Sequence, residues 1–92
     1  MRATLSIAMC TYNGARFLEA QLHSIAEQSR RPNELVVCDD DSTDETHSIL
    51  NRFAKSAPFS VNIHRNPVRL GSTKNFERAI ALTTGDLIAL AD

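Results

Sequence analysis

The stretch Leu35–Asp44, Leu-Val-Val-Cys-Asp-Asp-Asp-Ser-Thr-Asp, constrains the fold of this chain more than any other. The apolar run Leu35–Cys38 is followed at once by three consecutive carboxylates. Such a run is typical of a strand buried on both faces, as in a parallel sheet. The acids then lie at the carboxyl end of the strand, where open α/β sheets bind ligands. Adjacent carboxylates repel by roughly 4 kcal/mol per pair at about 4 Å and an effective dielectric near 20, so N–H donors, solvent, a ligand or a cation must relieve them.

Apolar periodicity on both sides of this stretch predicts alternating strands and helices. Strands are expected at Thr4–Cys10, Glu34–Asp39, Ser60–His64 and Asp86–Ala91, and helices at Ala15 to about Gln28, from Ser42–Glu45 to before Pro58, and at Thr73–Thr83. This order predicts an α/β fold, a Rossmann-like three-layer α/β/α arrangement with a parallel four-stranded sheet. Asn13 is the expected N-cap of the first helix, Ser42 and Glu45 are expected to form a capping box, and Gly85 is expected to stop the third helix.

Size and composition exclude several classes of protein. The chain has 92 residues, which is at most one small domain, and its net charge of −1 includes no long basic run, so nucleic acid is not an expected partner. Cys10 and Cys38 both end apolar runs, and we expect them to be reduced and buried in a cytoplasmic protein. No apolar stretch reaches spanning length, and the first residues lack a signal peptide's apolar region.

Tyr12 and the acids after the second strand are the first candidate site. The first two strands of a parallel sheet are commonly neighbours, which would place Tyr12, the only tyrosine, beside Asp40. An aromatic face next to a carboxylate acceptor forms a slot for a base or ribose, in which the ring stacks and the acid accepts N–H or O–H groups. The alternative is a structural tyrosine with a solvated turn and helix-capping acids, and this alternative is stronger for Asp41 and Asp44.

Asp92 is a second candidate, because it ends the fourth strand as Asp39 ends the second. Carboxylates at neighbouring strand ends suit a cation that bridges a diphosphate, since Mg²⁺ takes one or two carboxylates plus phosphate oxygens. Arg65, Arg69 and Lys74 precede that strand and could meet phosphate, although for each residue alone the pattern favours a solvated surface cation.

Four segments in the same order resemble family 2 glycosyltransferases of the GT-A fold, and most closely their bacterial rhamnosyltransferase-like branch. The resemblance covers essentially the whole chain, and its combination of motifs is specific. Asp41 is a departure, because the family commonly has glycine or asparagine there. The segments are Met9–Gly14, Cys38–Asp44, Leu70–Glu77 and Thr84–Asp92.

The resemblance implies both a chemistry and a set of residues. Family 2 enzymes transfer a sugar with inversion from a nucleoside diphosphate donor, here a UDP- or dTDP-sugar, to a hydroxyl of a saccharide or lipid-linked saccharide, in bacterial surface polysaccharide synthesis. The first acid of the family's D-x-D motif, which holds Mg²⁺ or Mn²⁺, matches Asp92. The nucleotide-binding positions are Thr11, Tyr12, Asn13, Asp39, Asp40, Asp44 and Lys74.

The catalytic base, the second D-x-D acid and the acceptor half are expected beyond residue 92, so no catalytic residue is assigned within the chain. Residues 1–92 are therefore expected to be the nucleotide-sugar-binding part of a GT-A domain, able to bind nucleotide but inactive alone. The full-length protein would be cytoplasmic or peripheral at the inner face of the membrane.

Other readings of the acid loop remain. A non-catalytic Mg²⁺-binding receiver-like module is the main alternative, but the third strand ends in His64-Arg65-Asn66 without the aspartate that receivers carry there. A nucleotidyltransferase or a dinucleotide-binding domain should show a Gly-rich signature that Thr11–Arg16 lacks. Because the fourth strand is apolar and would have an unpaired outer edge, self-association through it is also expected.

Overall fold

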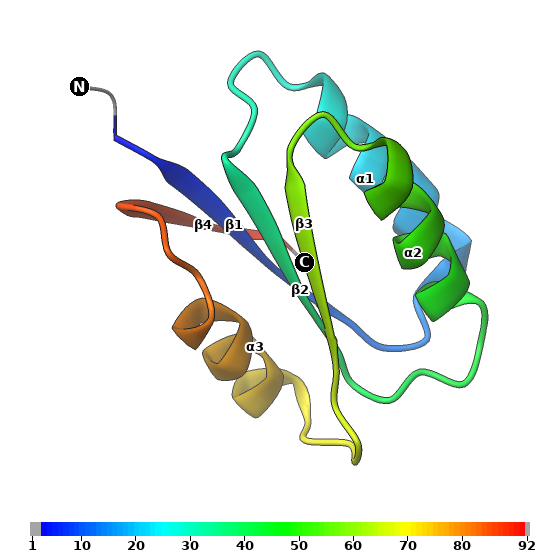
Figure 1. Cartoon of the computed structure of the whole chain (residues 1–92). Coiled ribbons are helices and arrows are strands. Elements are labelled where there is room, and N and C mark those ends of the chain that lie inside the picture. Colours follow the sequence, from blue (N-terminus) through cyan, green and yellow to red (C-terminus); the bar gives the residue numbers. More distant parts are fainter. Residues whose placement is uncertain (1–2, 92) are drawn as a thin grey trace.

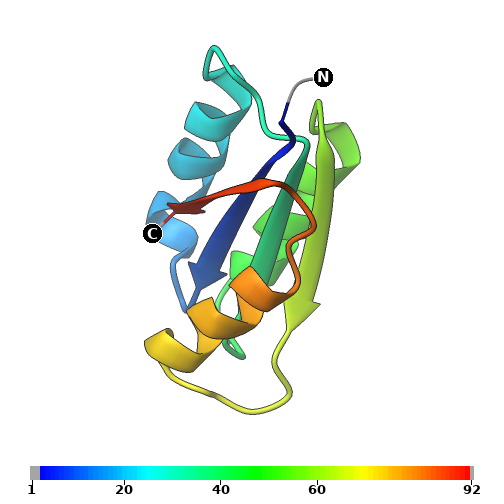
Figure 2. The ribbon, with the colours of Figure 1, turned by 90° about the vertical axis from the view of Figure 1, so that its left-hand side faces the viewer.

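The computed structural model describes residues 3–91, which form a four-stranded parallel sheet with helices on both faces (Figure 1). Helices α1 and α2 cover one face, and α3 lies on the other (Figures 1 and 2). This is the three-layer α/β/α fold predicted from the sequence. No helix in the described range is both long and apolar enough to cross a membrane. The elements are β1 (Leu5–Thr11), α1 (Ala15–Glu27), β2 (Glu34–Asp39), α2 (Thr46–Ser56), β3 (Ser60–Arg65), α3 (Ser72–Ala81) and β4 (Leu87–Ala91).

The strand order β3-β2-β1-β4 makes the first two strands neighbours, as expected. Thr11 of β1 lies in register with Asp39 of β2, and Asp39 lies in register with Arg65 of β3. Because all pairs are parallel, the carboxyl ends of these strands open at one edge of the sheet. The sheet therefore brings Tyr12 and Asp40, the next residues along each strand, to the same edge.

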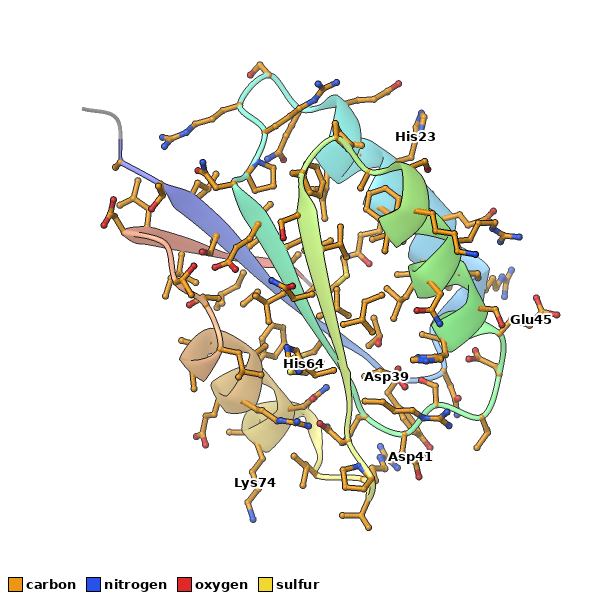
Figure 3. All side chains as sticks on the ribbon, viewed as in Figure 1. His23, Asp39, Asp41, Glu45, His64 and Lys74 are labelled. Atoms are coloured by element: carbon orange, nitrogen blue, oxygen red, sulfur yellow. The ribbon has the colours of Figure 1, made fainter. Side chains whose placement is uncertain are left out.

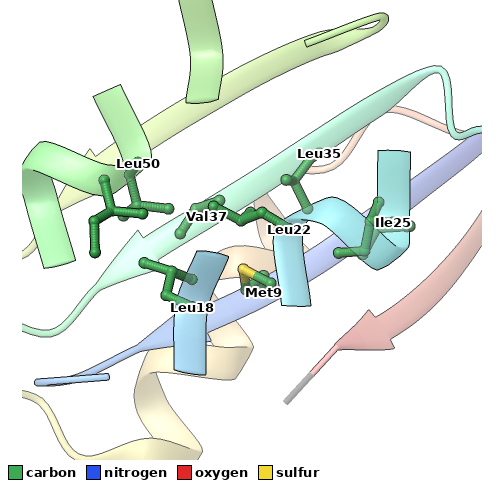
Figure 4. Close-up of a cluster of buried hydrophobic side chains, with 9 residues drawn as sticks. Met9, Leu18, Leu22, Ile25, Leu35, Val37 and Leu50 are labelled. Carbon is green, nitrogen blue, oxygen red and sulfur yellow. The ribbon is translucent and has the colours of Figure 1, made fainter. Parts of the chain in front are cut away.

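The main core lies between the sheet and the α1–α2 layer (Figure 4). Leu18 and Leu22 of α1 recur at helical spacing and are at most 2% exposed, while Leu50 of α2 is fully buried. They pack on the apolar side chains of β1 and β2, including Met9 and Val37. Every residue of β2 is buried, which is what its continuous apolar run predicts for a central strand.

Strand β4 forms an edge of the sheet and pairs only with β1. Its side chains Leu87, Ile88 and Leu90 are 47%, 44% and 62% exposed, so neither face of the strand is covered as β2 is. Helix α3 packs mainly over β1 and β2, where Ala79 contacts Ala8. The expectation of an apolar fourth strand with an unpaired outer edge is confirmed for the described residues.

Two of the predicted helix caps are wrong, and tertiary contacts explain both. Gly14 is the N-cap of α1, and no side chain caps that position. The Asn13 side chain instead reaches the acid loop. Helix α2 begins only at Thr46, and the Ser42 hydroxyl donates to the buried Asp39 carboxylate at 2.6 Å rather than capping a helix with Glu45. A hydrogen bond to a buried charge is stronger than a neutral capping bond, so the buried acid prevails.

Gly85 does not stop α3 as predicted but lies against Ser6 at the amino end of the sheet. A Cβ at Gly85 would come within 2.5 Å of the Ser6 hydroxyl oxygen, so only glycine fits. The buried Glu34 carboxylate accepts hydrogen bonds from the Ser6 hydroxyl and from the Thr84 amide, each at 2.6 Å. Burial raises the pKa of Glu34, but hydrogen bonds from Ser6 and Thr84 outweigh it and hold the pKa below its usual value. This network fastens the start of β4 to the sheet.

Candidate nucleotide site

Asp39 organises the loop that follows β2, and it is fully buried. Its Oδ1 accepts hydrogen bonds from the Thr11 and Ser42 hydroxyls, both at 2.6 Å, and its Oδ2 accepts one from the Ser42 amide at 3.0 Å. In Figure 3 its side chain lies at the carboxyl end of the strands, near the loop that carries Asp41. Both oxygens of Asp39 accept hydrogen bonds from the protein. Asp39 therefore holds the loop after β2 against the end of β1 through Thr11.

Asn13 and Asp44 join the loop after β1 to the loop after β2. Asn13 has a φ of 45° and accepts a 2.8 Å hydrogen bond from the Thr43 amide at its Oδ1. The Asp44 carboxylate accepts from the Ala15 amide at 3.2 Å and from the Thr46 amide at 2.9 Å, which are the amides of the first residues of α1 and α2. Hydrogen bonds from Thr46, with that from Ala15, hold the pKa of Asp44 below its usual value. Asn13 and Asp44 therefore hold the loop after β1 and the loop after β2 together.

Asp41 adopts a left-handed backbone conformation, with φ of 59°. Glycine adopts this conformation freely, and asparagine and aspartate tolerate it better than other side chains, which crowd the following carbonyl. The side chain is only half-buried and lies 3.5 Å from an Arg65 guanidinium nitrogen. This backbone conformation gives a physical reason for glycine or asparagine being favoured at the position.

Asp40 is buried and accepts hydrogen bonds from residues 66–71, the loop that joins β3 to α3. Its Oδ1 accepts from Asn66 Nδ2 at 2.9 Å and from the Leu70 amide at 2.7 Å, and its Oδ2 accepts from the Gly71 amide at 2.9 Å. The Arg69 Nε lies 3.8 Å from the same Oδ2. Burial raises the pKa of Asp40, but the hydrogen bonds from Leu70, Asn66 and Gly71 and the charge of Arg69 outweigh it, so the pKa lies below its ordinary value. Asp40 is therefore ionised at neutral pH.

A network of buried hydrogen bonds connects Asp40 to α3. Asn66 donates from the same Nδ2 to the Asn75 side-chain oxygen at 2.8 Å, and Asn75 donates to the Cys38 carbonyl at 2.9 Å. Arg78 donates to the Asn66 side-chain oxygen. Helix α3 thus fixes the asparagine that orients the carboxylate.

The candidate site is a pocket of about 280 Å³ between the ends of β1 and β2 and the start of α3. The Tyr12 ring and the Asp40 carboxylate both line it, and the Arg69 guanidinium carbon lies 3.9 Å from the centre of the Tyr12 ring. Pockets for drug-sized ligands hold about 300–1,000 Å³, so this one suits a single flat ring better than a whole sugar nucleotide. The lining residues are Cys10, Thr11, Tyr12, Asp40, Arg69, Ser72, Asn75 and Phe76.

The structure brings Tyr12 and Asp40 together in one pocket, as the expected strand order predicts, and Thr11 also lines this pocket. Lys74 is exposed on the first turn of α3, is not among the pocket-lining residues, and projects away from the ribbon in Figure 3. The predicted metal ligand, Asp92, lies outside the described residues.

Arg69, Asn66, Asn75 and Phe76 were not assigned to the site from the sequence. For Arg69 the sequence offers a phosphate contact or a solvated surface cation. Asn66 follows β3 directly, whereas Asn75 and Phe76 lie on α3, and the places of all three in the site depend on how the loop of residues 66–71 folds onto Asp40. The one signal available was the Leu70–Glu77 segment, which belongs to the family resemblance.

No group of three His, Cys, Asp or Glu side chains within residues 3–91 could hold a metal ion. Each carboxylate oxygen of Asp39 and Asp40 already accepts at least one hydrogen bond from the protein.

Comparison with known proteins decides the family. Residues 6–92 match the model of the family described as glycosyl transferase family 2. The chain belongs to glycosyl transferase family 2. This assignment favours the transferase interpretation of the acid loop over a receiver-like module.

Relatives and solved structures of this family agree with the assignment. The chain is 39% identical over 88 residues to dTDP-rhamnosyl transferase RfbG of Shigella flexneri, covering 91% of this chain and 30% of that protein. It is 32% identical over 84 residues to abequosyltransferase RfbV of Salmonella typhimurium, covering 89% of this chain and 25% of that protein.

The fold matches mannosyltransferase PcManGT of Pyrobaculum calidifontis, solved with GDP-Man and Mn²⁺, with a TM-score of 0.85 and 30% identity. It also matches TarS of S. aureus, solved with UDP, with a TM-score of 0.86 and 26% identity. These alignments cover 96% and 97% of this chain, and 26% and 27% of the others. This chain therefore spans about a quarter to a third of the length of each of these four proteins.

Proposed function

We propose that this chain binds the nucleotide of a nucleoside diphosphate sugar, and that the full-length protein transfers the sugar to an acceptor hydroxyl with inversion. The observation that carries the proposal is the single pocket formed by the Tyr12 ring and the ionised Asp40 carboxylate at neighbouring strand ends. A pyrimidine offers a flat face for the ring and an N3–H donor for a carboxylate, which accepts only. UDP- and dTDP-sugars are therefore the proposed donors, and the dTDP-dependent relative at 39% identity supports the rhamnosyltransferase-like branch.

The other predicted site residues take supporting places in this proposal. Thr11, Asn13, Asp39 and Asp44 hold the loops around the nucleoside. Lys74 would reach the diphosphate from the first turn of α3, where its charge is exposed to solvent. The proposed cation, Mg²⁺ or Mn²⁺, would be held in part by Asp92 and would neutralise charge on the departing nucleoside diphosphate. A neighbouring structure solved with Mn²⁺ supports this assignment.

Transfer with inversion requires a carboxylate that deprotonates the acceptor hydroxyl as the nucleoside diphosphate leaves. We assign no residue of this chain to that role, because Asp39 is enclosed by protein donors and Asp40 is proposed to accept the N3–H of the base. We propose that residues 1–92 bind nucleotide without turnover, since the matched relatives are three to four times as long. A turnover assay with assorted sugar nucleotides checks this, and product release at enzyme-like rates would contradict it.

Three further assignments belong to the same proposal. The acceptor is a saccharide or lipid-linked saccharide in bacterial surface polysaccharide synthesis. The location is cytoplasmic or peripheral at the inner face of the membrane. The exposed edge of β4 pairs with a second copy, and a strictly monomeric species across a sedimentation concentration series would contradict that pairing.

The direct test is a calorimetric titration of UDP and dTDP, with and without Mn²⁺, into the protein and its Tyr12→Leu variant. Stacking of a base on an aromatic ring contributes about 1–3 kcal/mol, so the variant should bind roughly 5- to 150-fold more weakly. Phe17→Leu is the matched control, because Phe17 is a more exposed aromatic residue, at 69%, outside the pocket. Equal affinities of Tyr12→Leu and Phe17→Leu, or no binding of either nucleotide, would remove the proposed function.

A further inference from the structure

We propose that in the free protein the Arg69 side chain occupies the place of the nucleotide's base, and that the base binds by displacing it. The inference rests on the proposed function above and adds a residue that sets the strength and selectivity of base binding. It starts from the position of one guanidinium group, which lies over the Tyr12 ring and beside the Asp40 carboxylate at once.

Arg69 lies beside both of the groups that a pyrimidine base would contact in this pocket. Its guanidinium carbon lies 3.9 Å from the centre of the Tyr12 ring, a stacking distance. Its Nε lies 3.8 Å from Asp40 Oδ2, which is longer than a hydrogen bond. A guanidinium is flat, stacks on aromatic faces and carries N–H donors at its edge, so it resembles the base in shape and in donor pattern.

Asp40 retains capacity for one more donor, and that capacity faces Arg69. An ionised carboxylate offers about four lone-pair positions. Asn66 and Leu70 take two at Oδ1, and Gly71 takes one at Oδ2. The remaining position is on Oδ2, the oxygen that Arg69 approaches without hydrogen bonding. A base N–H could take it once the guanidinium has moved.

The displacement needs a side-chain movement and no change of the loop. The amides of Leu70 and Gly71, which follow Arg69 directly, are bonded to Asp40, so the Arg69 backbone is held at the pocket. The Arg69 side chain itself is 61% exposed, whereas that of Asp40 is only 3% exposed. A solvent-exposed arginine leaves its stacked position at little cost, because its charge is readily hydrated.

Side-chain NMR of the protein with uridine as the probe tests the displacement directly. In the free protein, the ring current of Tyr12, the only tyrosine, should shift the Arg69 δ-methylene and ε-proton resonances upfield. Uridine should return them towards ordinary arginine positions as it saturates the site. Arg69 resonances that are already ordinary in the free protein, or that stay shifted while uridine binds, would overturn the inference.

Variants supply the affinity readout. Uridine lacks phosphate, so removing the arginine charge does not weaken attraction to the ligand. Loss of a cation–π contact worth about 1 kcal/mol predicts that Arg69→Met and Arg69→Ala bind uridine roughly fivefold more tightly than the parent protein. Arg52→Met is the matched control, because Arg52 is an exposed arginine paired with Glu19 on the α1–α2 side, and it should bind as the parent does.

The outcomes separate this inference from the proposed function. Unchanged or weaker uridine binding by both Arg69 variants, with UDP binding retained by the parent, would refute the displacement and leave the proposed function standing. Absence of binding of UDP and uridine by all proteins would remove the proposed function and the displacement together. Tighter uridine binding with loss of the upfield shift supports the inference.

Discussion

Replacing Asp40 by asparagine tests whether this carboxylate holds the loop of residues 66–71 in place. The substitution keeps the shape of the side chain but exchanges one acceptor oxygen for an NH₂ donor. Whichever way the amide is turned, its NH₂ group faces at least one donor, either the Gly71 amide or the pair formed by Asn66 and Leu70.

The expected loss of stability follows from these contacts. One buried N–H group loses its acceptor, which costs about 1–3 kcal/mol, and the remaining hydrogen bonds weaken by about 1 kcal/mol each because they no longer involve a charge. Part of this loss is offset, because the variant no longer has to bury a charge in the folded state. The net destabilisation should be ~2–3 kcal/mol, a large fraction of the about 5–15 kcal/mol stability of a typical domain. For a domain of this size it should lower Tm by about 10–15 °C.

Calorimetry and urea unfolding measure the effect. Asp41→Asn is the matched control, because it makes the same substitution at the adjacent residue. Asp41 is half-buried, has only a 3.5 Å contact with Arg65, and has a backbone conformation that asparagine tolerates. Its free energy of unfolding should change by at most about 0.5 kcal/mol. Equal Tm values for Asp40→Asn and Asp41→Asn would refute the role assigned to Asp40.

The pH dependence of the same pair gives an independent check. Because the folded-state pKa of Asp40 lies below its ordinary value of 3.8, its contribution to stability is present above that pH and is lost as pH falls through the folded-state pKa. The parent protein should therefore lose more stability on acidification below about pH 4 than Asp40→Asn does. A constant difference between the two across this window would contradict the assignment.

Three further predictions concern the fold. Glu34 also has a pKa below its ordinary value of 4.5, so Glu34→Gln should be less stable than the parent at pH 7, with a difference that shrinks as pH falls below about 4.5, measured by urea unfolding across pH. Gly85→Ala should lower the free energy of unfolding by about 1–3 kcal/mol because its Cβ would meet Ser6, whereas Gly14→Ala, with open space around it, should change little in the same experiment. Leu50→Ala should cost about 2–5 kcal/mol by calorimetry, since Leu50 is fully buried in the main core; a loss below 1 kcal/mol would contradict its place there.

The strands and the neighbouring positions of Tyr12 and Asp40 could be predicted because local pattern and sheet topology decide them. The apolar run of β2 requires burial on both faces, and the parallel order brings the ends of β1 and β2 together. The caps failed where a buried acid outcompeted a local bond, as Asp39 does for Ser42. Local propensity contains no information on such distant partners.

Arg69 shows a different limit of sequence reasoning. Its stacking on Tyr12 depends on a loop whose conformation is set by hydrogen bonds to Asp40, about 30 positions earlier in the chain. No spacing or periodicity within the loop of residues 66–71 indicates that contact. A surface cation and a group that stacks in the pocket look the same in the sequence.

Because β4 lies at an edge, protection of backbone amides from hydrogen exchange should differ between the strands of the sheet. Strand β2 has a paired strand on each side, whereas β4 has β1 alone and carries exposed leucines. At concentrations where no second copy pairs with β4, its amide protons should therefore exchange with deuterium faster than those of β2, because local opening of an edge strand disrupts fewer contacts. The carboxyl end of β4 could then adjust to a diphosphate while the base pocket on β1 and β2 keeps its shape.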